Sequence, residues 1–217
     1  MKTIKKITKI DSTKKLATTN KIIKTKKVFD NINGTFDKGV NYTDAYTKFS
    51  NDITGLINQD YLNQHELKRL AYLAISLIQL QNGSRISETI EATKQFISDY
   101  ECKVAVIIIA KRKDGFRRKI LLPELITKEI LERIKPEIKN DTIEELSKKI
   151  RMFLTRHYGW NTHSLRYALI NYLAIEKKVP INLVSKLVGH KNMNQLLTYT
   201  QNKHVDELLI SINKNTM

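Results

Sequence analysis

The sequence predicts an α+β fold that is mainly α-helical and carries one small antiparallel β-hairpin. Apolar residues recur at helical spacing from about Thr43 and again through the C-terminal half of the chain. Between these helical regions, a short β-branched run and a second strand flank the turn signal Asp114-Gly115. With 217 residues, of which 41% are hydrophobic, the chain is long enough for one main globular unit and an appendage.

Two helices are predicted before the hairpin. The first begins at about Thr43 and places five apolar side chains on one face: Tyr46, Phe49, Ile53, Ile57 and Leu62. The second runs from about Gln64 to Gln81, and its apolar residues cover more than one stripe, which is typical of a buried helix. Gly83 follows and tolerates the left-handed conformation that ends many helices.

The hairpin and the helices after it follow from local signals. Val104 to Ala110 and Arg117 to Leu122 are the predicted strands, and the tip between them is basic. Proline at a first turn, capping residues and helix-ending glycines then predict helices at about 123–134, 141–156 (capped by Asp141 or Thr142), 162–178 (capped by Thr162), 180–189, from 192, and 204–212.

The charge of the chain favours a polyanionic partner. The formal net charge is +16 and the sequence pI is near 9.8, so a strongly positive field surrounds the protein. A compositional bias toward lysine would also raise the charge, but nucleic acid is the partner that fits best. Charge alone does not identify the substrate.

The first 44 residues are expected to form a separate basic arm. Residues 1–28 contain ten lysines and a single acid, Asp11, with few large apolar groups that could build a core. The arm is either a solvated tail or a segment that follows DNA phosphates. Residues 45–217 are expected to form the main domain.

Cysteine usage and hydropathy indicate a reducing compartment. Cys102 is the sole cysteine, which excludes an intramolecular disulfide and a thiolate cluster for zinc. The longest apolar stretch, Leu70 to Leu80, is shorter than a membrane span, and no apolar run typical of a signal peptide follows the basic N-terminus. We expect a cytoplasmic protein with no membrane partner.

The C-terminal half contains residue types that can break a phosphodiester: a nucleophile, cations and hydrogen-bond donors. His163 and Arg166 lie three residues apart on the first turn of a predicted helix, where they share one face near its positive end. His190 follows Gly189, and Tyr199 comes nine residues later. Each signal alone is weak, because such pairs usually lie on surfaces and most tyrosines only pack; their joint spacing is specific.

Four ordered elements resemble the catalytic domain of the tyrosine recombinases, the phage-integrase and Xer-like family. The box Gly83-Ser84-Arg85-Ile86-Ser87-Glu88 follows a buried helix and is similar to the first arginine box of that family. The hairpin, the His-x-x-Arg motif at 163–166 and the Gly-His pair followed by Tyr199 then come in the family's order. The resemblance covers roughly residues 45–217.

The resemblance implies a role for each matching residue. Arg85 and Arg166 would hold the non-bridging oxygens of the scissile phosphate with a fork geometry that lysine lacks. His163 would take the proton of Tyr199, and His190 would donate a hydrogen bond. Tyr199 would form a 3′-phosphotyrosyl bond, which stores the energy of the broken bond, so no ATP, metal or other cofactor is expected. The sequence shows no Walker loop or acidic cluster suited to two metals.

Two hairpin lysines compete for the family's general acid. Lys111 and Lys113 share one face of a strand at a period of two residues. We favour Lys113, because it stands immediately before the Asp114-Gly115 turn, as the family's lysine does. Glu88 is expected to orient Arg85 rather than to react.

The chain departs from the family pattern in two places. Tyr167 follows Arg166 where many members carry another histidine. About 44 residues precede the predicted domain, which is too few for the family's helical DNA-clamping module, so the basic arm replaces that module or the recombinase is minimal or truncated.

The expected function is site-specific cleavage and rejoining of double-stranded DNA, by an integrase of a mobile element that acts as a homo-tetramer. A telomere resolvase and a nicking-closing enzyme similar to type IB topoisomerases would use the same side chains. A catalytically silent DNA-binding regulator of the same fold is the non-enzymatic alternative. The DNA sequence recognised cannot be read from these motifs.

Overall fold

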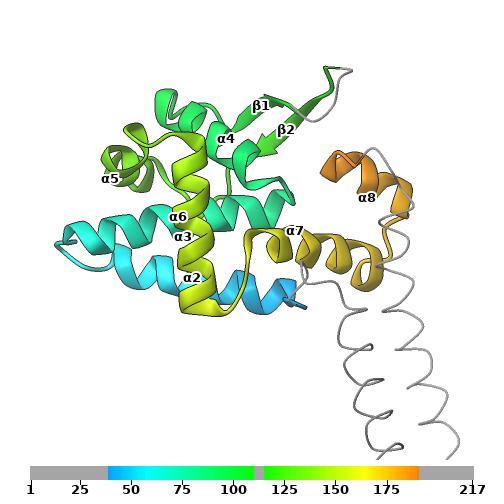
Figure 1. Ribbon diagram of the computed structural model, residues 1–217, viewed down its shortest axis with the longest axis horizontal. Coiled ribbons are helices and arrows are strands. Elements are labelled where there is room, and N and C mark those ends of the chain that lie inside the picture. Colours follow the sequence, from blue (N-terminus) through cyan, green and yellow to red (C-terminus); the bar gives the residue numbers. More distant parts are fainter. Residues whose placement is uncertain (1–38, 110–114, 191–217) are drawn as a thin grey trace, which may run out of the picture. The chain divides into compact units, whose positions relative to one another are not determined.

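The computed structural model describes residues 39–109 and 115–190 (Figure 1). In this part of the chain one sheet is present, with two antiparallel strands. The mainly helical architecture with this small sheet confirms the predicted α+β fold class. The elements in chain order are α2 (Tyr42–Ile57), α3 (Gln64–Asn82), α4 (Ile86–Ser98), β1 (Val104–Ile108), β2 (Arg117–Leu121), α5 (Lys128–Lys139), α6 (Ile143–Tyr158), α7 (Thr162–Asn171), the π-helix η1 (Tyr172–Glu176) and α8 (Ile181–Val188).

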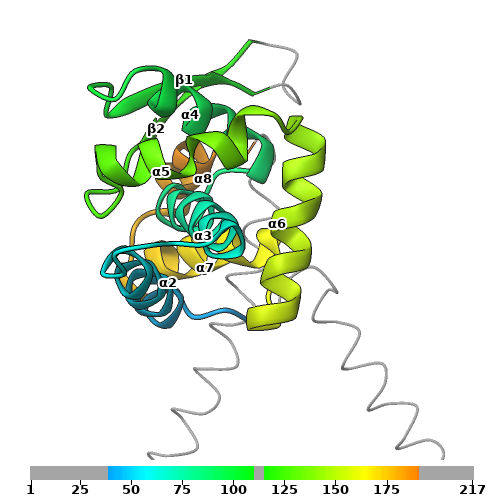
Figure 2. The same ribbon diagram turned by 90° about the vertical axis from the view of Figure 1, so that its left-hand side faces the viewer.

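Helix α3 is the centre of the core. It contacts α2, α4, α5, α6 and α7, and Figure 2 shows it surrounded by the other elements. Its N-terminus is fixed by a capping box, in which Asn63 accepts the backbone N–H of Glu66 at 3.0 Å and Glu66 accepts that of Asn63 at 2.9 Å. Burial of α3 on several sides explains why its apolar residues cover more than one stripe.

The β-hairpin has one buried and one exposed face. The register pairs Val104 with Leu121 and Ile108 with Arg117. Side chains of Ala105, Ile107 and Ile120 point into the core, whereas Val104, Val106 and Ile108 are exposed. The strands match the predicted pair, and the turn residue Asp114 lies outside the described residues.

Helix α4 is absent from the sequence-based prediction. Its buried positions include Thr89 and Thr93 beside Ile90 and Phe96, so threonines interrupt the apolar pattern. The Thr93 hydroxyl donates to the carbonyl of Thr89 at 2.8 Å, which satisfies this polar group within the helix itself. Because threonines occupy some of the buried positions, the spacing of apolar residues alone did not predict this helix.

Several predicted helix boundaries are wrong. The first helix ends at Ile57 rather than near Leu62, because Asn63 instead caps α3. Helix α5 spans residues 128–139 and not 123–134, since the backbone at Pro123 forms a turn that accepts from Ile126 N–H at 2.9 Å. Thr127 then provides the N-cap.

The predicted helix over 162–178 is in fact two elements. Helix α7 ends at Asn171 and continues as the π-helix η1 up to Glu176. Its N-cap is Asn161 and not Thr162: the Asn161 side chain accepts from the backbone N–H of Ser164 at 2.8 Å. Residues 162 and 163 thus lie inside the first turn.

Helix α8 packs on α7 through a second small cluster of buried side chains, formed by Tyr167, Ile170, Val184 and Val188. This contact brings the end of α8 to the end of α3. None of the helices over the described ranges 39–109 and 115–190 has the length and hydropathy needed to cross a membrane.

Candidate active site

The site is built around Gly83, where α3 ends. Its φ of +55° lies in the left-handed region, which favours glycine. A Cβ at this position would come within 2.9 Å of Cδ2 of Leu169 and 3.1 Å of Cγ1 of Val188. Glycine therefore permits both the backbone conformation and the close approach of α7 and α8.

Arg85 is held by Glu88 at the start of α4. Its Nη1 donates to Glu88 Oε1 at 2.8 Å, and its backbone N–H donates to Glu88 Oε2 at 3.1 Å. Glu88 is 5% exposed, so its carboxylate is desolvated and this ion pair is stronger than a surface pair. The contact agrees with the expectation that Glu88 orients Arg85.

Arg118 is a further member of this cluster, and sequence reasoning missed it. The guanidinium, on the buried face of β2, donates to Glu88 Oε2 at 3.3 Å and to the carbonyl oxygens of Gly83 at 3.4 Å and Val188 at 3.1 Å. It also donates to the carbonyl oxygen of Asn82. One arginine thus joins the C-terminal ends of α3 and α8 to the carboxylate that holds Arg85.

A signal for Arg118 was present in the strand pattern. Ile120 points inward and side chains alternate along a strand, so the side chain two residues earlier must also point inward. An arginine at such a position needs acceptors in the core. Burial lowers the pKa of Arg118, and the Glu88 carboxylate opposes that effect.

Arg166 lies on the second turn of α7 and is 2% exposed. Its Nη1 donates to the carbonyl oxygen of Gly83 at 2.6 Å, whereas its buried Nη2 has no acceptor among the described residues. Burial lowers the pKa of Arg166, and the positive charges of Arg85 and Arg118 lower it further. A buried cation with an unused donor is suited to bind an oxyanion.

His163 is exposed on the first turn of α7, three residues before Arg166. Its ring makes an edge contact with Tyr167, with 4.9 Å between the ring centroids. Tyr167 thus supports the imidazole from within the α7–α8 cluster. Electrostatic interaction with His163 also contributes to the lowered pKa of His190, so the two imidazoles lie close enough to influence each other.

His190 follows the left-handed Gly189 at the end of α8. The φ of Gly189 is +68°, in the left-handed region that favours glycine, and a Cβ there would lie 2.5 Å from Cδ1 of Ile109, whose side chain would have to shift. The backbone N–H of His190 donates to the carbonyl of Ser185 at 2.9 Å. Burial lowers the pKa of His190 to about 4, and electrostatic interactions with Arg166, Arg85 and His163 contribute.

The lowered pKa of His190 predicts a specific loss of stability in acid. Between pH 6.5 and about 4 the unfolded chain binds a proton at this position before the folded chain does, so folding becomes less favourable as the pH falls. We expect His190→Gln to flatten the pH dependence of the unfolding free energy over this window, as measured by urea denaturation. Equal slopes for wild type and His190→Gln would refute the prediction.

The structure brings four of the six predicted site residues into one cluster. Arg85 caps α4, His163 and Arg166 lie on α7, and His190 follows α8. Shared contacts join these elements: Arg166 and Arg118 both donate to the Gly83 carbonyl, Arg85 and Arg118 both bind Glu88, and Arg118 also donates to Val188 near His190. The predicted Lys113, the alternative Lys111 and the nucleophile Tyr199 lie outside the described residues. Three guanidinium groups against one carboxylate form a site for an anion rather than for a metal cation.

Comparison with known proteins identifies relatives of the chain. No family profile matches it. It is 36% identical over 199 residues to the provisionally named integrase V10 of Sputnik virophage, covering 80% of this chain and 88% of V10. It is 35% identical over 178 residues to the provisionally named integrase ORF241 of Acidianus two-tailed virus, covering 82% of this chain and 69% of ORF241.

Among solved structures, the chain is similar to the XerH site-specific recombinase bound to a palindromic difH substrate, with 18% identity and a TM-score of 0.49 over 78% of this chain and 52% of that one. The family assignment rests on the sequence relatives, together with the ordered motifs at Arg85, His163, Arg166 and Gly189. The chain therefore belongs to the tyrosine recombinase family and carries that family's catalytic domain.

Proposed function

We propose that this protein is a site-specific DNA recombinase or integrase that cuts and rejoins strands through a covalent bond to Tyr199. The observation that carries the proposal is the buried guanidinium of Arg166, which keeps one donor without an acceptor among the described residues, beside Arg85 and His190. A non-bridging phosphate oxygen is the acceptor that fits such a donor. The phosphate charge would also offset the mutual repulsion of the cations.

In the proposed reaction, the Tyr199 hydroxyl attacks the scissile phosphorus. The bond from phosphorus to the tyrosine oxygen forms as the bond to the 5′ oxygen breaks. His163 accepts the tyrosine proton, and Lys113 donates a proton to the departing 5′ oxygen; Lys111 remains the alternative donor. Arg85, Arg166 and His190 bind the non-bridging oxygens and stabilise the charge of the pentacoordinate phosphorus.

Rejoining reverses these steps. A 5′-hydroxyl attacks the phosphotyrosyl bond and releases Tyr199, so the number of phosphoester bonds is conserved. The protonation states of His163 and the hairpin lysine after cleavage are those that rejoining requires. Assembly of a homo-tetramer on double-stranded DNA belongs to the same proposal.

Trapping the covalent intermediate tests this function. A suicide substrate, in which the released fragment that carries the free 5′-hydroxyl is short enough to diffuse away, should give a protein–DNA adduct on a denaturing gel because rejoining is prevented. Tyr199→Phe should give no adduct, since phenylalanine lacks the attacking oxygen. Tyr61→Phe is a matched control that removes an exposed tyrosine hydroxyl and should still form the adduct.

An adduct with Tyr199→Phe would show that another residue is the nucleophile. Persistent DNA binding without any adduct from wild type, on attachment DNA of its own element, would favour the silent regulator. Release of a relaxed or hairpin product would instead identify nicking-closing or telomere-resolving activity.

The division of the chain into a basic arm (1–44) and a catalytic domain (45–217) is also a proposal. If the ten lysines of residues 1–28 contact DNA phosphates, deleting these residues should weaken DNA binding and flatten the plot of log binding constant against log salt concentration. Each lost phosphate contact should reduce the slope by about 0.9. An unchanged slope in a fluorescence-anisotropy titration would show that the arm does not contact DNA.

A further inference from the structure

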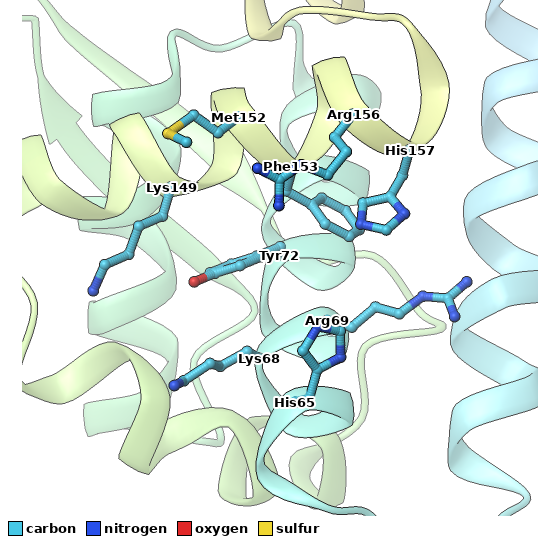
Figure 3. Close-up of a pocket in the computed structure, with 9 residues that line it drawn as sticks. All are labelled: His65, Lys68, Arg69, Tyr72, Lys149, Met152, Phe153, Arg156 and His157. Atoms are coloured by element: carbon cyan, nitrogen blue, oxygen red, sulfur yellow. The ribbon is translucent and has the colours of Figure 1, made fainter.

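A second cationic site lies away from the cluster around Gly83. Between the first half of α3 and the face of α6 is a cavity of about 260 Å³ (Figure 3). Six of its lining side chains carry basic groups: His65, Lys68, Arg69, Lys149, Arg156 and His157. The lining contains no carboxylate, so the cavity has a large excess of positive charge.

Two carboxylates outside the cavity pair with cations of its lining. Asp52 lies 3.5 Å from Nη2 of Arg69 but also accepts a hydrogen bond at 2.5 Å from the hydroxyl of Tyr158. Both carboxylate oxygens of Asp141 accept a hydrogen bond from Nζ of Lys149, each at 2.7 Å. The charge of two lining cations is therefore partly balanced from outside the cavity.

The remaining lysine and arginine of the lining, Lys68 and Arg156, have no carboxylate that balances their charge among the described residues. Lys68 and Arg156 are both exposed, and neither has an acidic partner in the part of the chain that the structure describes. Nε of Arg69 is buried and has no acceptor there either. In Figure 3 the side chains of α6 and α3 line the cavity from opposite sides, and the Arg69 guanidinium points away from Lys68 and Lys149, in keeping with its ion pair to Asp52.

The aromatic rings of Tyr72 and Phe153 also line the cavity. Phe153 contacts the ring of Tyr72 with 5.5 Å between centroids and that of His157 with 4.8 Å. Such rings exclude water from one side of the cavity, which strengthens hydrogen bonds between the cations and an anion.

We propose that this cavity binds a phosphate group, held mainly by Lys68 and Arg156. A phosphate offers several acceptor oxygens in different directions, so it can accept from donors on both helices. Arg69 and Gly83 lie at opposite ends of α3, about 20 Å apart at a rise of about 1.5 Å per residue. The bound group is therefore distinct from the scissile phosphate, and it belongs either to a free phosphate compound or to a nucleic-acid backbone.

The test compares two double variants that lose the same charge. Lys68→Gln/Arg156→Gln alters the cavity, whereas Arg133→Gln/Lys139→Gln alters exposed positions on α5. Inorganic phosphate is titrated while the NMR signals of the His65 and His157 rings are followed, and binding of a random-sequence duplex is measured against salt concentration. All variants carry Tyr199→Phe, so neither readout depends on strand cleavage or on the proposed function.

Two results support the proposal and identify the source of the phosphate. If the ligand is a free phosphate compound, inorganic phosphate should shift the histidine ring signals saturably in the parent and in the α5 variant. In the cavity variant the affinity for inorganic phosphate should be at least about tenfold lower. For a DNA backbone, the cavity variant should reduce the salt slope by up to about 1.8, or about 0.9 for each lost contact, and the α5 variant should not.

The proposal is overturned if inorganic phosphate causes no saturable shift and the two double variants have equal salt slopes. The double variant Lys68→Arg/Arg156→Lys provides a second check. It retains both charges, so it should bind inorganic phosphate or duplex DNA like the parent, in whichever of the two measurements the parent gives a response. Loss of binding by this variant, with its thermal unfolding unchanged, would also contradict a site that depends on charge.

Discussion

Replacing Arg166 by alanine should reduce DNA strand cleavage by about 100- to 1,000-fold, the range typical for removal of one donor to a developing oxyanion. The reason is its geometry: one guanidinium nitrogen is fixed on the Gly83 carbonyl at 2.6 Å, so the other is held in place for a phosphate oxygen. Duplex affinity should change little, because phosphate binding is distributed over many of the 38 lysine and arginine residues. Adduct formation under single-turnover conditions and anisotropy titrations measure the two effects separately.

Arg166→Lys is the informative companion variant. It retains a positive charge but cannot contact the Gly83 carbonyl and a phosphate oxygen through one planar fork, so cleavage should remain strongly reduced. Arg133→Ala, an exposed change on α5, should leave cleavage unaltered. If Arg166→Ala lowered affinity and cleavage by the same factor, the residue would serve ordinary DNA binding and the proposed role would be wrong.

Arg118→Met should destabilise the fold by about 3 kcal/mol, at the lower end of the range for breaking a buried ion pair. The variant would leave the Glu88 carboxylate with Arg85 as its remaining cationic partner and deprive the carbonyl of Val188 of a donor. The matched change at the adjacent exposed Arg117 should alter the unfolding free energy by less than about 0.5 kcal/mol. Urea denaturation of both variants measures the difference.

A double-mutant cycle separates the ion pair from simple packing. If the loss in Arg118→Met comes from the unbalanced Glu88 carboxylate, adding Glu88→Gln should cost less than the sum of the two single changes. Additive losses would show that Arg118 acts on the helix ends alone. A stability of Arg118→Met equal to that of Arg117→Met would contradict both interpretations.

Local signals in the sequence were sufficient for most of the elements around the site. Gly83 and Gly189 adopt the left-handed backbone expected of glycines that end helices, and the hairpin strands lie where the β-branched run and the Asp114-Gly115 turn signal predicted them. The prediction failed at α4, where buried threonines break the apolar period, and at α5, where Pro123 belongs to a turn instead of the first helical turn. At α4 the threonines are buried in the core, and at α5 the local cap at Thr127 sets the start of the helix.

The order and spacing of the motifs also identified the family without coordinates, which the sequence relatives then confirmed. The roles assigned to Arg85, Lys113, His163, Arg166, His190 and Tyr199 remain proposals, and the cleavage measurements on variants of Arg166 and Tyr199 test two of them.

What the sequence by itself determined is the set of reactive side chains and their order along the chain, together with the helical and hairpin segments that carry them. Tertiary structure alone decided how the side chains are held: Arg166 reaches a carbonyl 83 residues away, and Arg118 joins Glu88 to the ends of two helices. The physical reason is that a desolvated guanidinium must find acceptors wherever the packed core presents them. Apart from the Glu88 carboxylate, those acceptors are backbone carbonyls at helix ends, and no residue type in the sequence specifies them.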